Sequence, residues 1–185
     1  MSQNSVLGRL VGEPALERPD LLAPAVLDAL KSGPDAGEVL VAAIDPDLAD
    51  TAAFCQAYDV RPEDSANCVV VAGKREGEIR YAGCMILATT RADVNGVVRR
   101  LLDVRKASFA PMAEAVELTG MEYGGITPIG LPVGWPILVD AAVASADAVI
   151  IGSGIRGSKI ALPGRALAAL SGAVVVEGLA NPVTP

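Results

Sequence analysis

The sequence contains no histidine and few aromatic residues. The lack of histidine excludes Ser-His-Asp and Cys-His nucleophile pairs, zinc sites of the H-E-x-x-H type and an imidazole general base. Phe, Trp and Tyr make up 3% of the 185 residues, whereas hydrophobic residues as a whole make up 51%. We therefore expect one domain with an aliphatic core, and any catalysis must use groups other than imidazole.

Cysteine is also scarce. There are three cysteines, an odd number, at Cys55, Cys68 and Cys84. They lie in apolar surroundings and show no C-x-x-C spacing. Disulfides and thiolate metal sites are therefore not expected, and buried, inert thiols are the favoured interpretation. The sequence predicts neither a metal nor a cofactor.

Positive charge is in short supply, because 15 basic residues face 22 acidic ones. The net charge of -7 and the pI near 4.6 disfavour extensive electrostatic binding to nucleic acid or to an anionic membrane. No apolar run approaches the roughly 20 residues of a membrane span. The first ten residues, MSQNSVLGRL, lack the basic start and hydrophobic stretch of a signal peptide. We expect a cytoplasmic protein without a membrane partner.

Hydrophobic periodicity predicts helices mixed with adjacent strands. A first helix is expected from Asp20, as N-cap, to a stop at Gly33. Residues 67–73 and 79–88 should form a hairpin through the charged turn 74–78. Further helices are expected over 50–60, 91–103, 111–120, 141–146 and 163–172, and further strands over 38–45, 136–140, 147–154, 158–162 and 173–179. This pattern indicates an α/β fold with a mixed sheet, and the absence of linkers or repeats favours a single domain over 1–185.

One glycine motif imitates a dinucleotide fingerprint. Gly152, Gly154 and Gly157 satisfy G-x-G-x-x-G after a strand, and Glu177 lies where a ribose-binding acid would be expected. A helix starting in this motif would meet Pro163 in its second turn, at a cost of about 3 kcal/mol. A nucleotide-cofactor enzyme is therefore the least favoured hypothesis.

The segment YGGITPIGLPVGWPILVD, residues 123–140, spaces three prolines and two glycines regularly after a Gly-Gly pair. Gly124 and Gly125 can adopt positive φ and point consecutive N–H groups to one side, while Pro128 removes a donor and fixes its own φ. Such amides can hold a carbonyl or an oxyanion. The alternative is a rigid connection capped by Trp135.

Taken together, AVELTGMEYGGITPIGLPVGWPILVD and GSGIRGSKIALPGRALAAL resemble the YbaK-type family of prolyl-tRNA-synthetase-associated editing domains. The resemblance covers residues 51–178, including TAAFCQAYDVRPEDSANCVVVAG upstream, and is most specific in its second half. It implies a mixed, barrel-like sheet surrounded by helices, with a cleft for the 3′ end of a mischarged tRNA.

The resemblance also implies an activity. Members of the family hydrolyse the ester between a wrong amino acid and the terminal adenosine, without a metal, using backbone amides and hydroxyls of the substrate ribose. Gly124, Gly125 and Pro128 fall on the family's amide loop. The implied partners are a mischarged tRNA and an aminoacyl-tRNA synthetase.

The sequence departs from the family pattern at Asn67, where the family usually carries a lysine at the start of the first barrel strand. Lysine offers a charge-assisted hydrogen bond of about 1.5–3 kcal/mol, whereas neutral asparagine offers about 0.5–1.5 kcal/mol. Lys159 or Lys74 are candidates to supply the charge from elsewhere, and a solvated surface lysine is the alternative for each.

The remaining site candidates each have two interpretations. Ser153 and Gly154, in the glycine turn, either contact the substrate or stabilise the turn. Thr127 and Ile126, inside the amide loop, either line the pocket or belong to the loop cap and the core, respectively. Arg156 is either a phosphate contact or an exposed turn residue. The basic stretch 99–106 is either a tRNA contact or the solvent-exposed face of a helix.

Two functions follow from these observations. The first is a trans-editing hydrolase that deacylates mischarged aminoacyl-tRNA, with the ester held by the loop from Gly124 to Pro128. The second is a non-catalytic binding module of the same fold that recognises an aminoacyl-adenosine, a nucleotide or a protein partner. Asn67 distinguishes the two, since loss of the family lysine favours the second.

Overall fold

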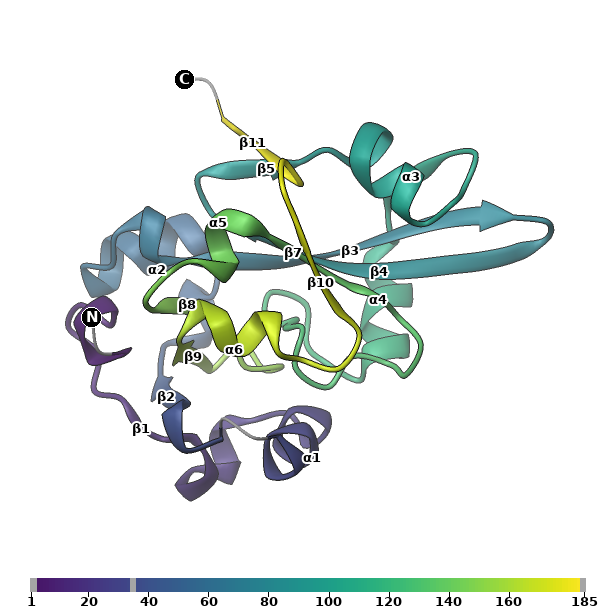
Figure 1. Ribbon diagram of the computed structural model, residues 1–185. Helices are drawn as coiled ribbons and strands as arrows, with labels where there is room; N and C mark the ends of the chain where they lie inside the picture. The colour runs from purple at the N-terminus through teal and green to yellow at the C-terminus, as the bar shows by residue number, and fades with distance from the viewer. Residues whose placement is uncertain (1–2, 34–35, 184–185) are drawn as a thin grey trace.

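The computed structural model describes residues 3–33 and 36–183. Two main sheets form its frame, with helices packed around them (Figure 1). The first sheet has four strands in the order β1-β2-β9-β8, and all its pairings are antiparallel. Its strands are β1 (Glu13–Pro14), β2 (Leu40–Ala43), β8 (Val149–Gly152) and β9 (Ser158–Leu162).

The second sheet has five strands in the order β10-β7-β4-β3-β6. The pairs β3–β4 and β3–β6 are antiparallel, whereas β4–β7 and β7–β10 are parallel. Its strands are β3 (Ala66–Arg75), β4 (Glu78–Leu87), β6 (Ala107–Phe109), β7 (Ile137–Asp140) and β10 (Ala173–Val176), while β5 (Thr90–Ala92) and β11 (Ala180–Pro182) pair separately. The predicted mixed α/β fold is confirmed. The described strands form no closed barrel, and a single bridge, Ser65 to Ile150, links the two main sheets.

The helices are short, and along the chain they are interspersed with the strands. They are α1 (Pro24–Ser32), α2 (Thr51–Tyr58), α3 (Arg99–Leu101), α4 (Met112–Thr119), α5 (Ala141–Ala144) and α6 (Gly164–Ala168). A π-helical turn, Val94–Val98, leads into α3, and 3₁₀ turns occupy Gln3–Val6, Ala15–Glu17, Pro19–Leu21, Ala36–Glu38, Pro46–Leu48 and Pro62–Asp64. None of the helices in the described part of the chain is long and apolar enough to cross a bilayer.

Two expectations for the helices were wrong in detail. Helix α1 begins at Pro24 rather than after Asp20, because proline suits the first helical position and the Asp20 carboxylate instead accepts hydrogen bonds from Arg18. The segment 91–103 is not one helix, since it opens with β5 and a π-helical turn. The predicted stop of α1 at Gly33 and the β3–β4 hairpin are confirmed.

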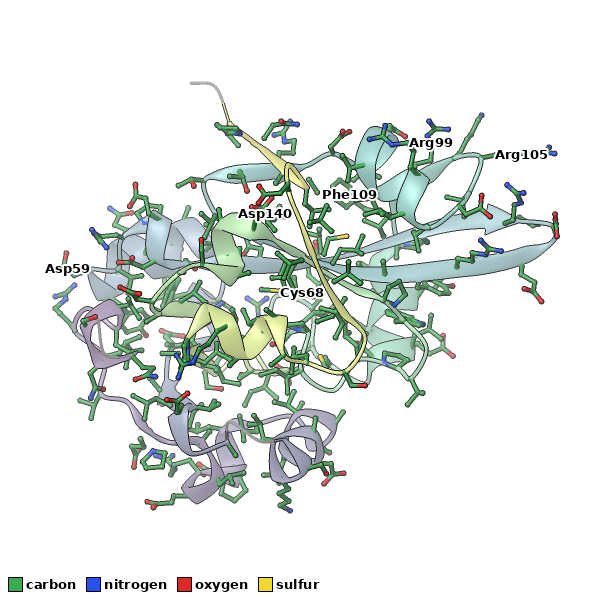
Figure 2. The ribbon with its side chains drawn as sticks, viewed as in Figure 1. Asp59, Cys68, Arg99, Arg105, Phe109 and Asp140 are labelled. Carbon is green, nitrogen blue, oxygen red and sulfur yellow. The ribbon has the colours of Figure 1, made fainter. Side chains whose placement is uncertain are left out.

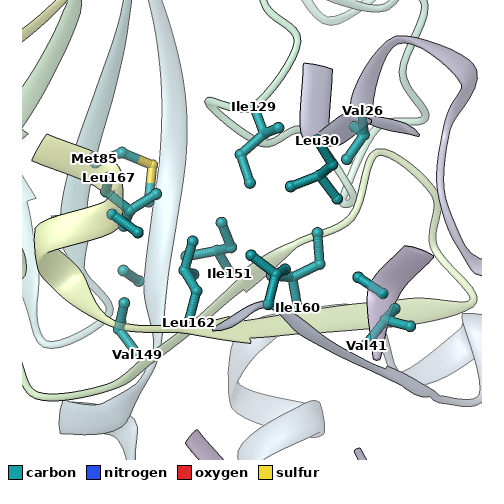
Figure 3. Close-up of a cluster of buried hydrophobic side chains, with 14 of the residues drawn as sticks. Val26, Leu30, Val41, Met85, Ile129, Val149, Ile151, Ile160, Leu162 and Leu167 are labelled. Atoms are coloured by element: carbon teal, nitrogen blue, oxygen red, sulfur yellow. The ribbon is translucent and has the colours of Figure 1, made fainter. Parts of the chain in front are cut away.

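The largest core cluster is aliphatic, as the composition predicts (Figure 3). It packs Val26 and Leu30 of α1 and the nearby Ile129 against Ile151 of β8 and Ile160 of β9. Each such side chain contributes about 1.5–3 kcal/mol when fully buried. This cluster matters for function because it fixes the loop 122–131 on the N-terminal part of the chain.

Candidate functional site

Two glycine-rich loops, 122–126 and 152–156, pack backbone against backbone. The Gly154 N–H donates to the Gly125 carbonyl at 2.7 Å, and the Glu122 N–H donates to the Gly154 carbonyl at 2.9 Å. A Cβ on Gly125 would lie 2.5 Å from the Ile155 carbonyl oxygen, and one on Gly152 would meet the Gly125 carbonyl. Glycine is therefore required by the close approach of the two loops.

The G-x-G-x-x-G motif has a different structural role from the one that its spacing suggests. It spans the turn of a hairpin, since β8 and β9 are antiparallel neighbours with Gly152 opposite Lys159. A dinucleotide fingerprint requires a strand followed by a helix at this point. The dinucleotide interpretation is therefore rejected.

A pocket of about 440 Å³ opens beside the two loops. Its wall contains residues 49–51 at the start of α2, residues 66–70 of β3, and Phe109, Ala110, Met112 and Ala115 around the start of α4. The loops add Tyr123, Gly124, Ile126 and Gly152, and β9 adds Lys159. The pocket exists because β6 pairs with only Val71–Gly73 of β3, so the earlier part of that strand edge borders open space.

Asn67 lies in this wall with its side chain held in place. Its Oδ1 accepts a hydrogen bond from the Thr51 hydroxyl at 2.8 Å. Thr51 is the first residue of α2, whose N-cap Asp50 accepts from the Ala52 and Ala53 amides. Thr51 fixes the orientation of the amide, and no acceptor in residues 3–33 and 36–183 takes an N–H of its Nδ2 group, so these donors are available to a ligand.

Lys159 brings a positive charge into the same pocket. It is 7% exposed, its Nζ donates to the Ala49 carbonyl at 3.1 Å, and the ammonium lies 5.2 Å from the centre of the Phe54 ring. Burial lowers the pKa of Lys159, with Arg156 acting in the same direction, while Cys55 and Asp50 oppose the shift. Lys74, the other lysine considered as a source of charge, is exposed on the β3–β4 hairpin outside this pocket.

The backbone amides of the 122–126 loop are not equivalent. The Gly125 N–H donates to the Glu122 carbonyl at 2.9 Å, so it is occupied within the turn. In residues 3–33 and 36–183, no acceptor takes the N–H of Gly124 or of Ile126, and both residues line the pocket. Gly124 has φ of +88°, which glycine adopts without strain. The arrangement leaves two main-chain donors, one charge and one amide side chain around a single pocket.

A family model for the aminoacyl-tRNA editing domain matches residues 45–170. The chain belongs to the aminoacyl-tRNA editing domain family. Solved structures share the fold of this editing domain. One is a candidate trans-editing enzyme for prolyl-tRNA synthetase, at 22% identity and a TM-score of 0.70 over 84% of this chain and 97% of that one.

A second similar structure is hypothetical protein APE2540, at 22% identity and a TM-score of 0.72 over 85% of this chain and 99% of that one. A third, from work on grafting linear epitopes onto scaffold proteins, has 22% identity and a TM-score of 0.70 over 84% of this chain and 95% of that one. No curated protein sequence matches the chain significantly.

Several predicted site residues of the editing domain lie outside the pocket wall. Pro128 is buried and faces a separate hollow between α1 and α6. Thr127 is fully buried, and its hydroxyl has no hydrogen-bond partner among the described residues. The Ser153 hydroxyl lies 2.6 Å from that of Ser158, and Gly154 joins the two loops. In this structure these residues shape the loops.

Arg156 holds the loops from outside. Its guanidinium donates to the Tyr123 carbonyl at 3.1 Å and to the Pro46 carbonyl at 2.9 Å, and its main-chain N–H donates to the Glu122 carboxylate at 2.6 Å. Trp135, the proposed cap, stacks on Tyr81 of β4 with 4.7 Å between ring centres. The segment 123–140 is thus a rigid connection that also presents free amides.

The editing domain offers no thiolate nucleophile in the pocket. Burial raises the pKa values of Cys55, Cys68 and Cys84, so at neutral pH these groups are thiols, and only Cys68 borders the pocket. All three cysteines are free. In the part of the chain that the structure describes, no cluster of three His, Cys, Asp or Glu side chains could hold a metal ion.

Sequence reasoning missed three contributors to this site, Thr51, Phe109 and Tyr123. Thr51 carried a signal in the form of an Asp-Thr helix start, but its contact with Asn67 joins residues 16 positions apart. Phe109 lines the pocket from β6. This strand has only three residues, too few to show the alternation of apolar and polar residues by which a strand is predicted from sequence. Tyr123 directly precedes the Gly-Gly pair, and its position depends on the turn.

Proposed function

We propose that this protein is a trans-editing deacylase, which hydrolyses the ester between a mischarged amino acid and the 3′-terminal adenosine of a tRNA. One observation carries the proposal, namely that a single pocket gathers Asn67, Lys159 and the unoccupied amides of Gly124 and Ile126. These are hydrogen-bond donors of the kind that stabilise the oxyanion formed when water attacks an ester carbonyl.

The amides act on the carbonyl. In the proposed complex, the ester oxygen accepts from the Gly124 and Ile126 N–H groups, which become stronger donors to it as negative charge develops. Gly125 has a positioning role, because its own N–H is used by Glu122 and its carbonyl holds Gly154. Removal of one such donor typically lowers kcat by about 10²–10³.

Lys159 supplies the charge that Asn67 does not. A buried ammonium is costly to desolvate, and one protein acceptor, the Ala49 carbonyl, leaves two of its three N–H donors for the substrate. The Asn67 Nδ2 group adds a neutral donor on the facing strand. Together they orient the aminoacyl group or the ribose of the terminal adenosine.

The reaction balances without a protein nucleophile. Water adds to the ester carbonyl, the C–O bond to the ribose breaks, the amino acid leaves as a carboxylic acid that ionises, and the ribose oxygen takes up a proton. The proton lost by water reaches the leaving oxygen through the neighbouring ribose hydroxyl. The chain provides binding, orientation and charge stabilisation.

The second candidate is a binding module without hydrolysis, favoured by the single observation that Asn67 replaces the family lysine. In that case the pocket would hold an aminoacyl-adenosine, a nucleotide or a protein segment without turnover. Lys159 favours the enzyme, since it restores a cation to the pocket.

Hydrolysis of tRNAs charged with Ala, Cys, Ser, Thr and Pro tests the proposal. We expect release from at least one mischarged species by the natural protein, and a loss of about 10²-fold or more in Lys159→Met, with partial recovery in Lys159→Arg. Lys31→Met removes an exposed lysine of α1, outside the pocket, and serves as the matched control.

Asn67→Lys decides between the two candidates. Release by the natural protein establishes hydrolysis without the family lysine. Release that appears only in Asn67→Lys means that the site is intact but unused, and supports the binding module. No release from any species by either protein contradicts the deacylase.

A further inference from the structure

The pocket mouth collects the exposed aromatic side chains. Phe109, Met112 and Tyr123 are 55%, 56% and 57% exposed, and all three line the pocket. Phe109 and Tyr123 are the exposed aromatic residues of the described chain, in a sequence with only six aromatics. We call these three residues the rim. Exposed rings at a pocket mouth are costly to maintain in water and are typical of a binding surface.

The rim is held rigidly. Tyr123 is fixed through its carbonyl, which accepts from Arg156 at 3.1 Å. Phe109 lies at the end of β6, opposite Val71 of β3. Met112 begins α4. Because the backbone of each residue is anchored, little conformational entropy is lost when a flat ligand packs against them.

Positive charge gathers in one stretch of the chain. Residues 74–106 hold eight of the 15 basic residues and four of the 22 acidic ones, a net charge of +4, whereas the rest of the chain carries -11. The stretch includes the turn of the β3–β4 hairpin, which extends from the body of the molecule (Figure 1). Figure 2 shows Arg99 and Arg105 pointing outward in this region.

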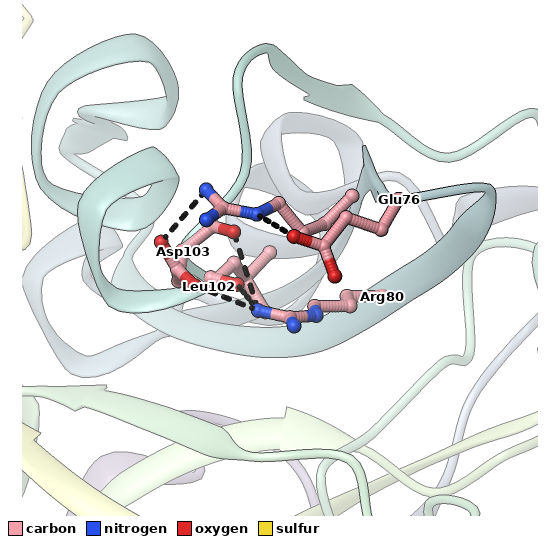
Figure 4. A network of polar contacts seen from close by, with 5 residues as sticks. Glu76, Arg80, Leu102 and Asp103 are labelled. Carbon is pink, nitrogen blue, oxygen red and sulfur yellow. Dashed lines mark hydrogen bonds and ion pairs between the residues drawn. The ribbon is translucent and has the colours of Figure 1, made fainter.

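Part of this charge is neutralised by one aspartate. Asp103 pairs with Arg75 at 3.2 Å and with Arg80 at 3.3 Å, and Arg80 also donates to the Leu102 carbonyl (Figure 4). Lys74, Arg105 and Lys106 remain without a carboxylate partner in the described chain. These three residues line one hollow of about 580 Å³ beside the hairpin turn, together with Gly77 and the paired side chains of Arg75 and Glu76; we call it the cationic hollow.

Strand β6 connects the two features. Lys106 directly precedes the strand and Phe109 ends it, so about 10 Å of extended chain separates the cationic hollow from the rim. Lys74 and Lys106 also line a second hollow, which extends along β6 to Pro111 and Glu114. The two features are therefore neighbours along β6.

We infer that the rim and the cationic hollow form a docking surface for the single-stranded 3′ end of the tRNA. The rim stacks the unpaired terminal bases while the aminoacyl group enters the pocket, and Lys74, Arg105 and Lys106 contact backbone phosphates. This inference rests on the proposed function. It identifies how an acidic protein binds RNA, with the -11 remainder repelling phosphates and orienting the strand toward the hairpin.

A fluorescent RNA tests the rim separately from hydrolysis. The probe is an uncharged minihelix RNA that ends in C-C-A with 2-aminopurine in place of the terminal adenine. Stacking on the rim is expected to quench its fluorescence in a saturable way as the natural protein is added. Phe109→Leu and Tyr123→Leu should each weaken binding about 5- to 150-fold, the effect of losing one stacked base.

Two variants serve as controls for the rim. Phe109→Tyr keeps a flat ring and should retain the quenching. Val174→Ala removes an exposed apolar side chain of β10, outside the pocket wall, and should bind like the natural protein. Equal binding by all rim variants would overturn the inference.

The salt dependence of binding tests the cationic hollow. Replacing Arg105 and Lys106 together by glutamine should reduce the slope of log affinity against log salt by about 0.7–0.9 for each phosphate that the protein no longer neutralises. The matching variant Lys31→Gln should leave the slope unchanged. An unchanged slope in the double variant would remove the cationic hollow from the docking surface.

The outcomes separate this inference from the deacylase itself. Quenching that depends on Phe109 and Tyr123, without hydrolysis of any charged tRNA, supports the docking surface and contradicts the deacylase. Hydrolysis that is insensitive to Phe109→Leu and Tyr123→Leu, with no quenching, supports the deacylase and overturns the docking surface.

Discussion

The Thr51 hydroxyl donates to Asn67 Oδ1 at 2.8 Å, and this contact orients the Asn67 amide in the pocket wall. A serine or threonine at the start of a helix commonly bonds the backbone of its own first turn. Here Asp50 caps α2, which leaves Thr51 to bond a side chain on a different element. The orientation of Asn67 therefore depends on the position of α2.

Asn67→Asp tests whether the Nδ2 donors are used. Aspartate keeps the acceptor for Thr51 but has no N–H and adds a negative charge to a pocket proposed to stabilise an oxyanion. We expect kcat/KM for deacylation to fall by at least about tenfold, equivalent to about 1.4 kcal/mol. Thr51→Val, which frees the amide to rotate, should cause a smaller loss. Unchanged activity in Asn67→Asp would exclude this residue from substrate orientation.

Lys159→Met is expected to stabilise the fold while removing activity. Burial lowers the pKa of Lys159 in the folded protein, whereas in the unfolded chain it is ordinary, near 10.5. At pH values between these two pKa values the unfolded chain binds more protons, so the stability of the natural protein rises with pH in that window. Each unit by which burial lowers the pKa of Lys159 corresponds to a loss of about 1.4 kcal/mol in the free energy of unfolding at neutral pH.

Urea unfolding across the alkaline range measures this effect. The natural protein should gain stability toward pH 10, and Lys159→Met should lack that gain and be more stable at pH 7. Lys31→Met provides the comparison, because Lys31 is exposed. The explanation fails if the pH dependence of Lys159→Met equals that of the natural protein.

The packing of the two loops predicts contrasting effects at two glycines. A Cβ on Gly152 would meet the carbonyl oxygens of Gly125 and Ile126, whereas one on Gly157 meets nothing within 4 Å. Gly152→Ala should therefore lower the free energy of unfolding by about 1–3 kcal/mol and impair deacylation, because it separates the loops. Gly157→Ala should stay within about 0.5 kcal/mol. Thermal denaturation of both variants makes the comparison, and similar losses would contradict it.

Thr127→Val distinguishes a buried loop residue from a substrate contact. The Thr127 hydroxyl is buried without a partner among the described residues, and valine has nearly the same shape. Removing an unsatisfied polar group should raise the free energy of unfolding by about 1 kcal/mol and leave KM unchanged. A rise in KM with unchanged stability would show that the hydroxyl contacts the substrate.

The elements with strong local patterns were predictable from sequence. The β3–β4 hairpin, the end of α1 at Gly33 and the short helices α2 and α4 follow from periodicity and capping. Asn67, Gly124, Ile126 and Lys159 were also candidates, and the structure brings them to one pocket.

The other features depend on contacts that no local pattern records. Occupation of the Gly125 amide is decided by a turn back to Glu122. The buried positions of Thr127 and Pro128 are decided by packing against distant segments, as at Gly130, where a Cβ would lie 2.5 Å from the Ala25 carbonyl. Phe109 reaches the pocket only because β6 pairs with β3 over three residues.

The main-chain character of the donors has an evolutionary consequence. The N–H groups of Gly124 and Ile126 persist whichever side chains surround them, so wall residues such as Val69 and Ile126 can be exchanged without losing the donors. Gly125 and Gly152 cannot be replaced without separating the loops, since a Cβ on either one would meet the backbone of the other loop. Under the proposed function, a lineage of such proteins can therefore diverge in the amino acid that it accepts while its chemistry is inherited unchanged.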